Sequence, residues 1–338
     1  MSERLTLRAL AKVAGVSHTT VSLALRNNLS ISPDVRRQIH ELANQLGYQP
    51  DPLVAKVMSS LRFPQEGARR LAFVTRFPDD SWRSRPTFGR TYQAVVKRAS
   101  LLGYTVDEFS LNAKGMTGRR LSEILDTRAI RGIMISPSFS SRSHISIDFE
   151  KLSSVTFGYS VIRPAIHRVA NHQIHSLLQA MRKLRRFGNN RIGLVMLGNA
   201  DERSDYNWAA GLSIFNGHIP ASRRVPMLSM KDEKFDEFAK WFFRYRPDAI
   251  VGLSKNLPEW LARLKLKVPE DVQVAILDKH PTDGEFAGID QHHEIAGAVA
   301  VDMLLGQMYL NECGVPPLSR TMLIEGSWVD GPSAGKRG

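Results

Sequence analysis

Apolar residues recur at helical spacing in three short segments near the amino terminus. The apolar positions are Leu7, Leu10, Ala11 and Ala14 in the first segment, Val21, Ala24 and Leu25 in the second, and Val35, Ile39, Leu42 and Leu46 in the third. Thr6, Ser17 and Ser32 stand just before these segments, where a hydroxyl can accept from a free backbone amide at a helix start. Gly15 and Gly47 follow the first and third segments, where glycine favours a turn. The pattern predicts a compact unit of three short helices.

The first two helices and the tight turn between them describe a helix-turn-helix. The polar side of the second helix carries short side chains that can hydrogen-bond, namely Ser17, His18, Thr19, Thr20 and Ser22. Such side chains suit the base edges and phosphates of a DNA major groove. A small helical bundle with no DNA contact can contain the same helix pair, so the motif alone leaves both interpretations open.

The charge of the chain favours a nucleic-acid partner. Residues 1–70 hold ten lysine and arginine residues against five acidic ones, and the whole chain has a formal net charge of +13. A basic domain neutralises phosphates and binds DNA with an affinity that depends on salt. The rest of the chain is basic as well, so charge alone does not distinguish DNA binding from an ordinary solvated surface.

Beyond Arg70 the pattern changes, because short apolar runs alternate with helical patterns. The apolar runs, which fit buried parallel strands, are 71–75, 103–106, 132–136, 155–157, 191–196, 249–252 and 272–277. The helical patterns are 88–102, 121–126, 174–187, 208–215, 235–244, 258–264 and 294–310. Strands that alternate with helices are typical of an α/β fold with parallel sheets. About 270 residues of this pattern are too many for one small sheet, so we predict two α/β lobes.

The run from Thr6 to Ser22 (TLRALAKVAGVSHTTVS) and the later run from Leu46 to Pro50 (LGYQP) closely resemble the DNA-binding end of the lactose/galactose repressor (LacI/GalR) family of bacterial transcription regulators. The resemblance implies a transcription regulator, usually a repressor, that binds a near-palindromic DNA operator as a homodimer. It also implies a small effector, usually a carbohydrate, that binds in a cleft between two lobes. Neither a cofactor, a metal nor an enzymatic activity is expected.

The resemblance and the hydrophobic pattern together predict how the chain is divided. Residues 1–50 would form an all-α helix-turn-helix headpiece, and residues 51–68 a hinge segment. Residues 69–332 would form an α/β two-lobed, periplasmic-binding-protein-like domain for effector binding and dimerisation. Lobe 1 is expected at about 69–162 plus 294–322, and lobe 2 at about 163–293 plus 323–332. The basic tail, residues 333–338, is expected to be disordered.

The resemblance implies roles at the DNA for single residues. His18 and Thr19 would read bases from the start of the second helix. The residues that would face phosphates are Ser17, Thr20, Ser22, Asn27 and Ser32, and the further predicted DNA contacts are Leu7, Leu23, Lys56, Val57 and Met58.

Three positions depart from the family pattern. Leu23 stands where the family usually has an arginine, and leucine offers only an apolar contact, for example to a thymine methyl group. The preferred operator should therefore differ from the common family operator. Val57 stands where the family has a leucine that wedges between bases, so either Val57 or its neighbour Met58 would act as the wedge. Pro52 is an additional proline in the hinge.

Ligands of open α/β sheets bind outside the carboxyl ends of the strands. Candidate ligand contacts, at such ends or at positions matched to the family, are Trp82, Arg83, Ser136, Arg203, Trp208, Ser254, Asp278 and His293. Asp278 is the strongest candidate, because it ends its strand where the family has a sugar-binding aspartate, and such a carboxylate can accept from two sugar hydroxyls. It could instead cap a helix or pair with Lys279 or His280. Trp208 could stack on a sugar ring or lie in the core.

Two further features bear on the cleft. Trp82 and Arg83 lie in a long loop after the first strand of the larger domain, and such a loop could close the cleft or be a solvated basic segment. Asn171 and His172 stand where the family usually has an aspartate before the second-lobe helix, so the effector need not be a simple hexose.

Several protein classes are disfavoured. The chain has no signal-peptide pattern and no run of about 18 apolar residues, so we expect a cytoplasmic protein without membrane contact. Its one cysteine, Cys313, excludes an intrachain disulfide. The ten histidines show no metal-binding spacing, and the acidic pairs Asp79-Asp80 and Asp201-Glu202 lack a positioned nucleophile, which disfavours an enzyme that acts on carbohydrates. The main alternative is a solute-binding protein without a regulatory role, which would need export.

Overall fold

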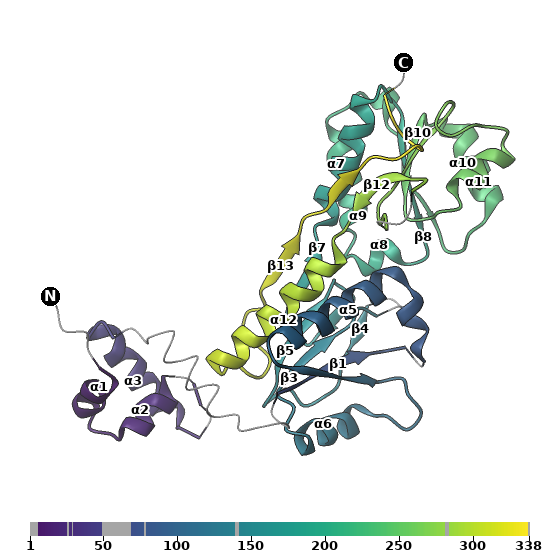
Figure 1. The fold of residues 1–338 in the computed structure, drawn as a ribbon. Coiled ribbons are helices and arrows are strands. Elements are labelled where there is room, and N and C mark those ends of the chain that lie inside the picture. The colour runs from purple at the N-terminus through teal and green to yellow at the C-terminus, as the bar shows by residue number, and fades with distance from the viewer. Residues whose placement is uncertain are drawn as a thin grey trace.

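The computed structural model describes residues 6–25, 27–28, 30–48, 69–77, 79–138, 142–280 and 284–336. The headpiece, residues 6–48, contains the helices α1 (Leu7–Ala14), α2 (His18–Ala24) and α3 (Pro33–Gln45) (Figure 1). The side chains buried at its centre are Leu10, Ala11, Val21, Ala24, Ile39 and Ala43. A core this small makes the headpiece only marginally stable by itself.

Local hydrogen bonds fix where the first two helices begin. Thr6 Oγ1 accepts from Ala9 N at 3.2 Å, and Ser17 Oγ accepts from Thr20 N at 3.0 Å. Gly15 turns the chain between α1 and α2 with a φ of 66°, a conformation that most other residues adopt only with strain. The predicted caps of α1 and α2 and the predicted glycine turn are therefore confirmed.

The third helix differs in detail from the prediction. Ser32 stands at its start without a side-chain cap bond, and Pro33 occupies the first helical turn. Leu46, which the periodicity places in the apolar stripe, is 41% exposed. Leu46 lies at the carboxyl end of α3, one residue after its last helical residue, Gln45.

One large sheet, with the helices on its faces, forms lobe 1. Its strands are all parallel in the order β13-β7-β5-β3-β1-β2. They are β1 (Arg70–Thr75), β2 (Thr105–Ser110), β3 (Gly132–Ile135), β5 (Ser153–Phe157), β7 (His167–Asn171) and β13 (Thr321–Ile324). Two long helices, α5 (Pro86–Leu101) and α12 (His293–Leu310), cover one face, and α6 (Gly118–Thr127) covers the other (Figure 1). A sheet covered on both faces explains why its strands read as continuous apolar runs.

A second large sheet forms lobe 2 in the order β14-β12-β11-β10-β8-β9, and only β14 is antiparallel to its neighbour. Its strands are β8 (Ile192–Leu197), β9 (Leu228–Met230), β10 (Ala249–Gly252), β11 (Gln273–Ile276), β12 (Ala287–Asp290) and β14 (Ser327–Val329). Its helices are α7 (Gln173–Arg186) and α9 (Asn207–Gly217) on one face, and α10 (Phe235–Tyr245) and α11 (Leu257–Arg263) on the other.

The remaining elements are short. They are the helix α8 (Ala200–Arg203), the 3-10 helices η1 (Asp80–Ser84) and η2 (Ala221–Arg223), and the strand pair β4 (Ser143–His144) and β6 (Val161–Arg163). In the part of the chain that the structure describes, no helix is long and apolar enough to span a bilayer.

The described chain crosses between the lobes after β7, after β12 and after β13, as Figure 1 shows. The first crossing lies later than the sequence predicts, because residues 167–171 form β7, which pairs with β5 and β13 of lobe 1. Placing residues 163–171 in lobe 2 was therefore wrong. The last segment of lobe 1 likewise extends through β13 to Ile324 rather than ending at residue 322.

The expected disorder of the tail is wrong for residues 333–336. Ser333 is buried, and its Oγ donates to Val274 O at 2.6 Å and accepts from Ala287 N at 2.9 Å. Gln273 Nε2 also donates to Gly335 O at 2.7 Å. These bonds join the tail to the ends of two neighbouring strands. Residues 337–338 lie outside the described part.

The close approach of α5 and α12 depends on one glycine. A Cβ atom on Gly297 of α12 would lie 2.5 Å from Thr91 O and 2.8 Å from Ala94 Cβ, both on α5. On the same helix, a Cβ atom on Gly306 would meet no heavy atom within 4 Å. The first glycine therefore permits packing, whereas the second lowers helix propensity without an evident packing benefit.

We predict that Gly297→Ala destabilises the protein by about 1–3 kcal/mol, because the methyl group forces the two helices apart. The matched control Gly306→Ala should leave the stability unchanged or raise it by up to about 1 kcal/mol. Urea unfolding of both variants measures the difference. Equal stabilities for the two variants would contradict the close approach of α5 and α12.

Candidate DNA interface and interlobe cavity

The start of α2 exposes His18 and Thr19 to solvent. Ser17 and Thr20, which flank these two residues, are hydrogen-bonded to each other. Ser17 Oγ lies 2.8 Å from Thr20 Oγ1 and accepts from Thr20 N at 3.0 Å. The cap thus holds Ser17 and Thr20 at the helix start. His18 and Thr19 are left as the exposed side chains between them, directed away from the small core.

The other predicted DNA contacts differ in their exposure to solvent. Leu7, Ser22 and Leu23 are half-buried, Asn27 and Ser32 are exposed, and Lys56, Val57 and Met58 lie outside the described residues. Asn27 also has a structural role. Its backbone adopts a φ of 55°, and its carbonyl oxygen accepts from Arg36 Nη1 at 3.1 Å. Its side-chain Oδ1 lies 3.1 Å from His40 Nε2. It therefore anchors the connection between α2 and α3.

A cavity of about 420 Å³ lies between the two lobes. Lobe 1 contributes Arg85, Thr87, Phe88, Tyr159 and His293, among others, and lobe 2 contributes Arg203, Trp208, Leu253, Lys255 and Asp278, among others. Leu253 and Asp278 follow β10 and β11, so the cavity lies at the carboxyl ends of the strands, where α/β proteins commonly bind ligands. Its size suits a small organic molecule.

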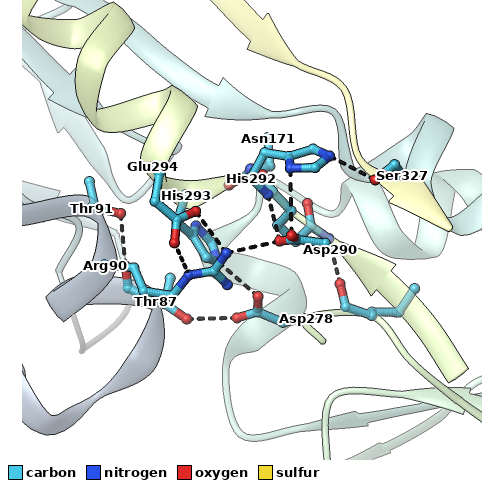
Figure 2. Close-up of polar contacts among 12 residues, drawn as sticks. Thr87, Arg90, Thr91, Asn171, Asp278, Asp290, His292, His293, Glu294 and Ser327 are labelled. Carbon is cyan, nitrogen blue, oxygen red and sulfur yellow. Dashed lines mark hydrogen bonds and ion pairs between the residues drawn. The ribbon is translucent and has the colours of Figure 1, made fainter. Parts of the chain in front are cut away.

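Asp278 joins the lobes across this cavity. Its Oδ2 accepts from Thr87 Oγ1 at 2.7 Å, and its Oδ1 lies 2.8 Å from His293 Nε2 (Figure 2). Thr87 lies in the first turn of α5 and His293 begins α12, so both partners belong to lobe 1. Burial raises the pKa of Asp278, but the contacts with His293 and Thr87 and the charge of Arg90 outweigh it and hold the pKa well below its usual value.

Arg90 makes a second link beside the first. Its guanidinium is largely buried and lies between two carboxylates, with Nε 2.5 Å from Glu294 Oε1 and Nη2 3.1 Å from Asp290 Oδ1 (Figure 2). Glu294 is on α12 of lobe 1, whereas Asp290 ends β12 of lobe 2. The hydrogen bond from Arg90 lowers the pKa of Glu294. A buried guanidinium with two carboxylate partners fixes geometry well, because its donors lie in one plane.

A third polar cluster lies where the chain crosses between the lobes. His172 Nδ1 lies 2.8 Å from Glu325 Oε1, and His175 Nδ1 contacts Glu325 Oε2. The three ligand atoms lie within 4.8 Å of one another, which makes this the group of described residues that could hold a metal ion. The hydrogen bonds, which lower the pKa of Glu325, account for the arrangement without an ion.

Residues 6–51 match the family model described as bacterial regulatory proteins, lacI family. The headpiece therefore carries a lacI-family helix-turn-helix domain. The HTH-type transcriptional regulator DegA of Bacillus subtilis (strain 168) is 23% identical over 287 residues, which cover 81% of each protein. The likeness to a named regulator thus extends well beyond the helix-turn-helix.

Solved structures of similar fold cover nearly the whole chain. A complex of the transcriptional regulator CelR with cellobiose has a TM-score of 0.56 at 18% identity, over 98% of this chain and 100% of that one. A lac repressor dimer bound to operator and the anti-inducer ONPF has a TM-score of 0.57 at 16% identity, over 98% and 99%. These likenesses confirm the predicted fold class, a helical headpiece followed by a two-lobed α/β domain.

Four of the ligand contacts predicted from the sequence line the cavity, namely Arg203, Trp208, Asp278 and His293. Trp208 is both a core residue and a lining residue, because it is 5% exposed and packs within lobe 2 while one edge meets the cavity. The two interpretations that the sequence left open for Trp208 are therefore compatible.

Part of the predicted cleft loop is a short helix that packs on lobe 1. Residues 80–84 form η1, which buries Trp82 to 2% exposure against Phe73 and Tyr92, with ring centroids 5.7 Å and 5.0 Å away. Arg83 lies over the Trp82 ring at 4.8 Å and forms an ion pair with Glu108. Placing Trp82 and Arg83 at the ligand was therefore wrong.

The two predicted serines also lie away from the cavity lining. Ser136 is 2% exposed, and its Oγ lies 3.3 Å from Pro137 O. Ser254 Oγ donates to Glu233 at 3.1 Å and accepts from Asn256 N at 3.1 Å. Each serine therefore organises its own turn after a strand.

On the lobe 1 side of the site, sequence reasoning identified His293 but missed Thr87 and Arg90. Thr87 and Arg90 follow Pro86, which is a recognisable start signal for a helix that comes after a strand. Such a helix begins at the carboxyl edge of the sheet, so its first turns were identifiable as candidate contacts. Nothing in the sequence indicated that Thr87 would meet Asp278, 191 residues away.

The lowered pKa of Asp278 predicts a pH-dependent stability. A carboxylate with a depressed pKa stabilises the folded state above its unfolded pKa of about 3.9, and this contribution is lost as the pH falls below that value. Asp278→Asn should therefore cost about 1–3 kcal/mol at pH 7, and the difference from wild type should shrink as the pH falls towards 3. Thermal unfolding as a function of pH measures it.

The matched control is Asp302→Asn, because Asp302 pairs with Arg98 on an exposed surface of lobe 1. This variant should differ little from wild type at either pH, since exposed ion pairs contribute little. A stability loss in Asp278→Asn that does not change with pH would show that the carboxylate charge has no part in joining the lobes.

Proposed function

We propose that this protein is a transcription regulator of the lacI family, a repressor that binds a near-palindromic DNA operator as a homodimer under the control of a small ligand in the interlobe cavity. The observation that carries the proposal is the start of α2, which lies within the family-matched residues and exposes His18 and Thr19 beside a firmly capped first turn. Such a turn fits the way in which helix-turn-helix proteins present a recognition helix to the major groove.

In this proposal His18 and Thr19 read base edges, and Ser17, Thr20, Ser22, Asn27 and Ser32 face phosphates. Leu7 and Leu23 give apolar contacts, and Leu23 favours thymine methyl groups over guanine. Residues 51–68 connect the headpiece to the lobes as a hinge, with Lys56, Val57 and Met58 at the minor groove. Supporting this arrangement, one solved structure of similar fold is a repressor dimer bound to its operator.

The ligand is proposed to be a carbohydrate or a carbohydrate derivative. A solved structure of similar fold holds cellobiose, and Trp208 gives this cavity an aromatic edge. Ligand binding would favour one separation of the lobes and so change DNA affinity, by no more than the difference in ligand affinity between the two states. A regulator of this kind acts in the cytoplasm, where the DNA is, and has no catalytic role.

Lobe 1 offers a surface for the proposed homodimer. Ile295 of α12 is 50% exposed, and Met322 and Leu323 of β13 are 47% and 40% exposed. β13 is the outermost strand of its sheet, next to β7. Apolar side chains on an unpaired strand edge invite association. A dimer formed here would place two headpieces on one DNA molecule.

We predict that the double substitution His18→Ala with Thr19→Ala removes sequence preference while largely retaining the salt dependence of DNA binding, because phosphate contacts remain. Operator sequences selected from a random duplex library provide the probe. The affinity for selected over scrambled duplex should fall by about tenfold or more. The control Gln38→Ala changes an exposed uncharged residue of α3 and should behave like wild type. Undiminished preference in the double variant would exclude these residues as base readers.

A second prediction concerns the dimer. Met322→Glu should shift the protein to monomers in sedimentation experiments and weaken operator binding, because the two headpieces then no longer bind as one unit. Phe243→Glu is the matched control, since Phe243 is 60% exposed on α10 of lobe 2. It should leave the dimer intact. If Met322→Glu sediments like wild type, the dimer does not form through the edge of lobe 1.

A further inference from the structure

Three side chains that can bind metal ions meet where the chain crosses between the lobes. His172 stands at the cap position of α7 and His175 lies in its first turn, whereas Glu325 lies between β13 and β14. His172 Nδ1 lies 2.8 Å from Glu325 Oε1, and His175 Nδ1 contacts Glu325 Oε2. Both imidazole rings therefore direct the same ring nitrogen towards one carboxylate, which comes from a distant part of the chain.

The backbone around the cluster is itself held in place. The His172 amide donates to Ile324 O at 2.9 Å, so the two crossing segments continue the pairing of β7 with β13. Packing constrains the residue that follows Glu325, because a Cβ atom on Gly326 would lie 2.7 Å from Ser176 Oγ of α7. The three side chains therefore start from a backbone that needs little rearrangement, as a preformed binding site requires.

The ligand atoms and their spacing suit a zinc ion. Zinc binds imidazole nitrogen and carboxylate oxygen at about 2.0–2.2 Å, which places the ligand atoms of a tetrahedral site about 3.3 Å apart. In this cluster the three ligand atoms lie within 4.8 Å of one another. His175 and Glu325 are exposed, so their side chains have room for the small rotations that coordination needs. Magnesium and calcium, which prefer oxygen ligands alone, suit this set less well.

Hydrogen bonding alone gives the cluster only a small role. All three side chains are partly exposed, and exposed contacts between such groups contribute little to stability. The same three atoms can bind an ion once each imidazole carries its proton on Nε2, because Nδ1 then offers a lone pair. The hydrogen bonds bring the ligands together in the free protein, and an ion would take the place of the protons between them.

We propose that His172, His175 and Glu325 form a zinc-binding site that joins two of the crossings between the lobes. A water molecule would complete the coordination, because three protein ligands leave the fourth position open. The described lining of the interlobe cavity does not include these three residues, so the zinc site is separate from the proposed effector site.

The position of the site indicates what a bound ion would do. The segment between β7 and α7 and the segment between β13 and β14 both lead from lobe 1 into lobe 2. An ion bound by both segments would prevent one of them from bending without the other. Zinc would therefore restrict the movement of the lobes and slow hydrogen exchange in residues 172–176 and 325–327.

Isothermal titration of the untagged, full-length protein with zinc chloride, after chelator treatment and dialysis, tests the proposal. One ion per chain should bind with a dissociation constant in the micromolar range or below. His175→Ala removes a ligand and should weaken binding by about tenfold or more. Glu325→Gln keeps the shape of the side chain but removes its charge, and it should weaken binding as well. Both variants should unfold like wild type without zinc, since the contacts they lose are exposed.

The matched control is His218→Ala, because His218 is an exposed histidine of lobe 2 outside the cluster. It should bind zinc like wild type. In the zinc-loaded wild type, X-ray absorption should show two imidazole nitrogen ligands at about 2.0–2.1 Å. Slower hydrogen exchange with zinc should appear in wild type and in His218→Ala, but not in His175→Ala.

Two results would overturn the proposal. One is the absence of stoichiometric zinc binding at micromolar concentration. The other is unchanged zinc affinity in both His175→Ala and Glu325→Gln, or an equal loss in these variants and in His218→Ala, because the ion would then be bound elsewhere or without a defined site. None of these measurements involves DNA or an effector, so their outcome is independent of the proposed function.

Discussion

The arrangement of the larger domain depends on the bond between Asp278 and Thr87. Asp278 follows β11 in lobe 2 and Thr87 begins α5 in lobe 1, so one carboxylate oxygen joins elements that are 191 residues apart. His293 holds the second oxygen, and Arg90 adds an ion pair to Asp290 nearby. Each contact is individually modest, but all of them lie on one rim of the cavity, so separating the lobes breaks them together. The lobe separation seen here is therefore a stable arrangement that a ligand can favour or oppose.

The headpiece is held together in a different way. Its contacts are local: Thr6 and Ser17 cap neighbouring helices, and a few apolar side chains form the core. Such a unit needs little long-range order, which allows it to present a short helix to another molecule. The side chains at the first turn of α2 differ in their contacts. The Ser17 hydroxyl accepts from the backbone amide of Thr20, and the side chains of His18 and Thr19 are left exposed.

Periodicity and start signals were enough to predict α5, α12, β10 and the three headpiece helices, because each is specified by its own residues. The edge elements were harder. β7 was taken for part of lobe 2, since its place is decided by pairing with β5 and β13, the latter about 150 residues further along the chain. Trp82 was expected beside a ligand, but a 3-10 helix turns it into the core. In the cavity, strand ends and positions matched to the family pointed to the lobe 2 residues Asp278 and Arg203. On the lobe 1 side sequence reasoning identified His293 but missed Thr87 and Arg90, whose positions follow from how the two lobes face each other.

The central claim is that the cavity and the DNA-binding surface affect each other through the lobes. Ligand affinity measured by titration for the free protein and for the protein saturated with its selected operator tests this most directly. By linkage, the two dissociation constants for the ligand must differ by the same factor as the operator affinity measured with and without ligand. We predict a clear difference that agrees with that factor. Equal ligand affinities for free and operator-bound protein would show that the cavity does not control DNA binding.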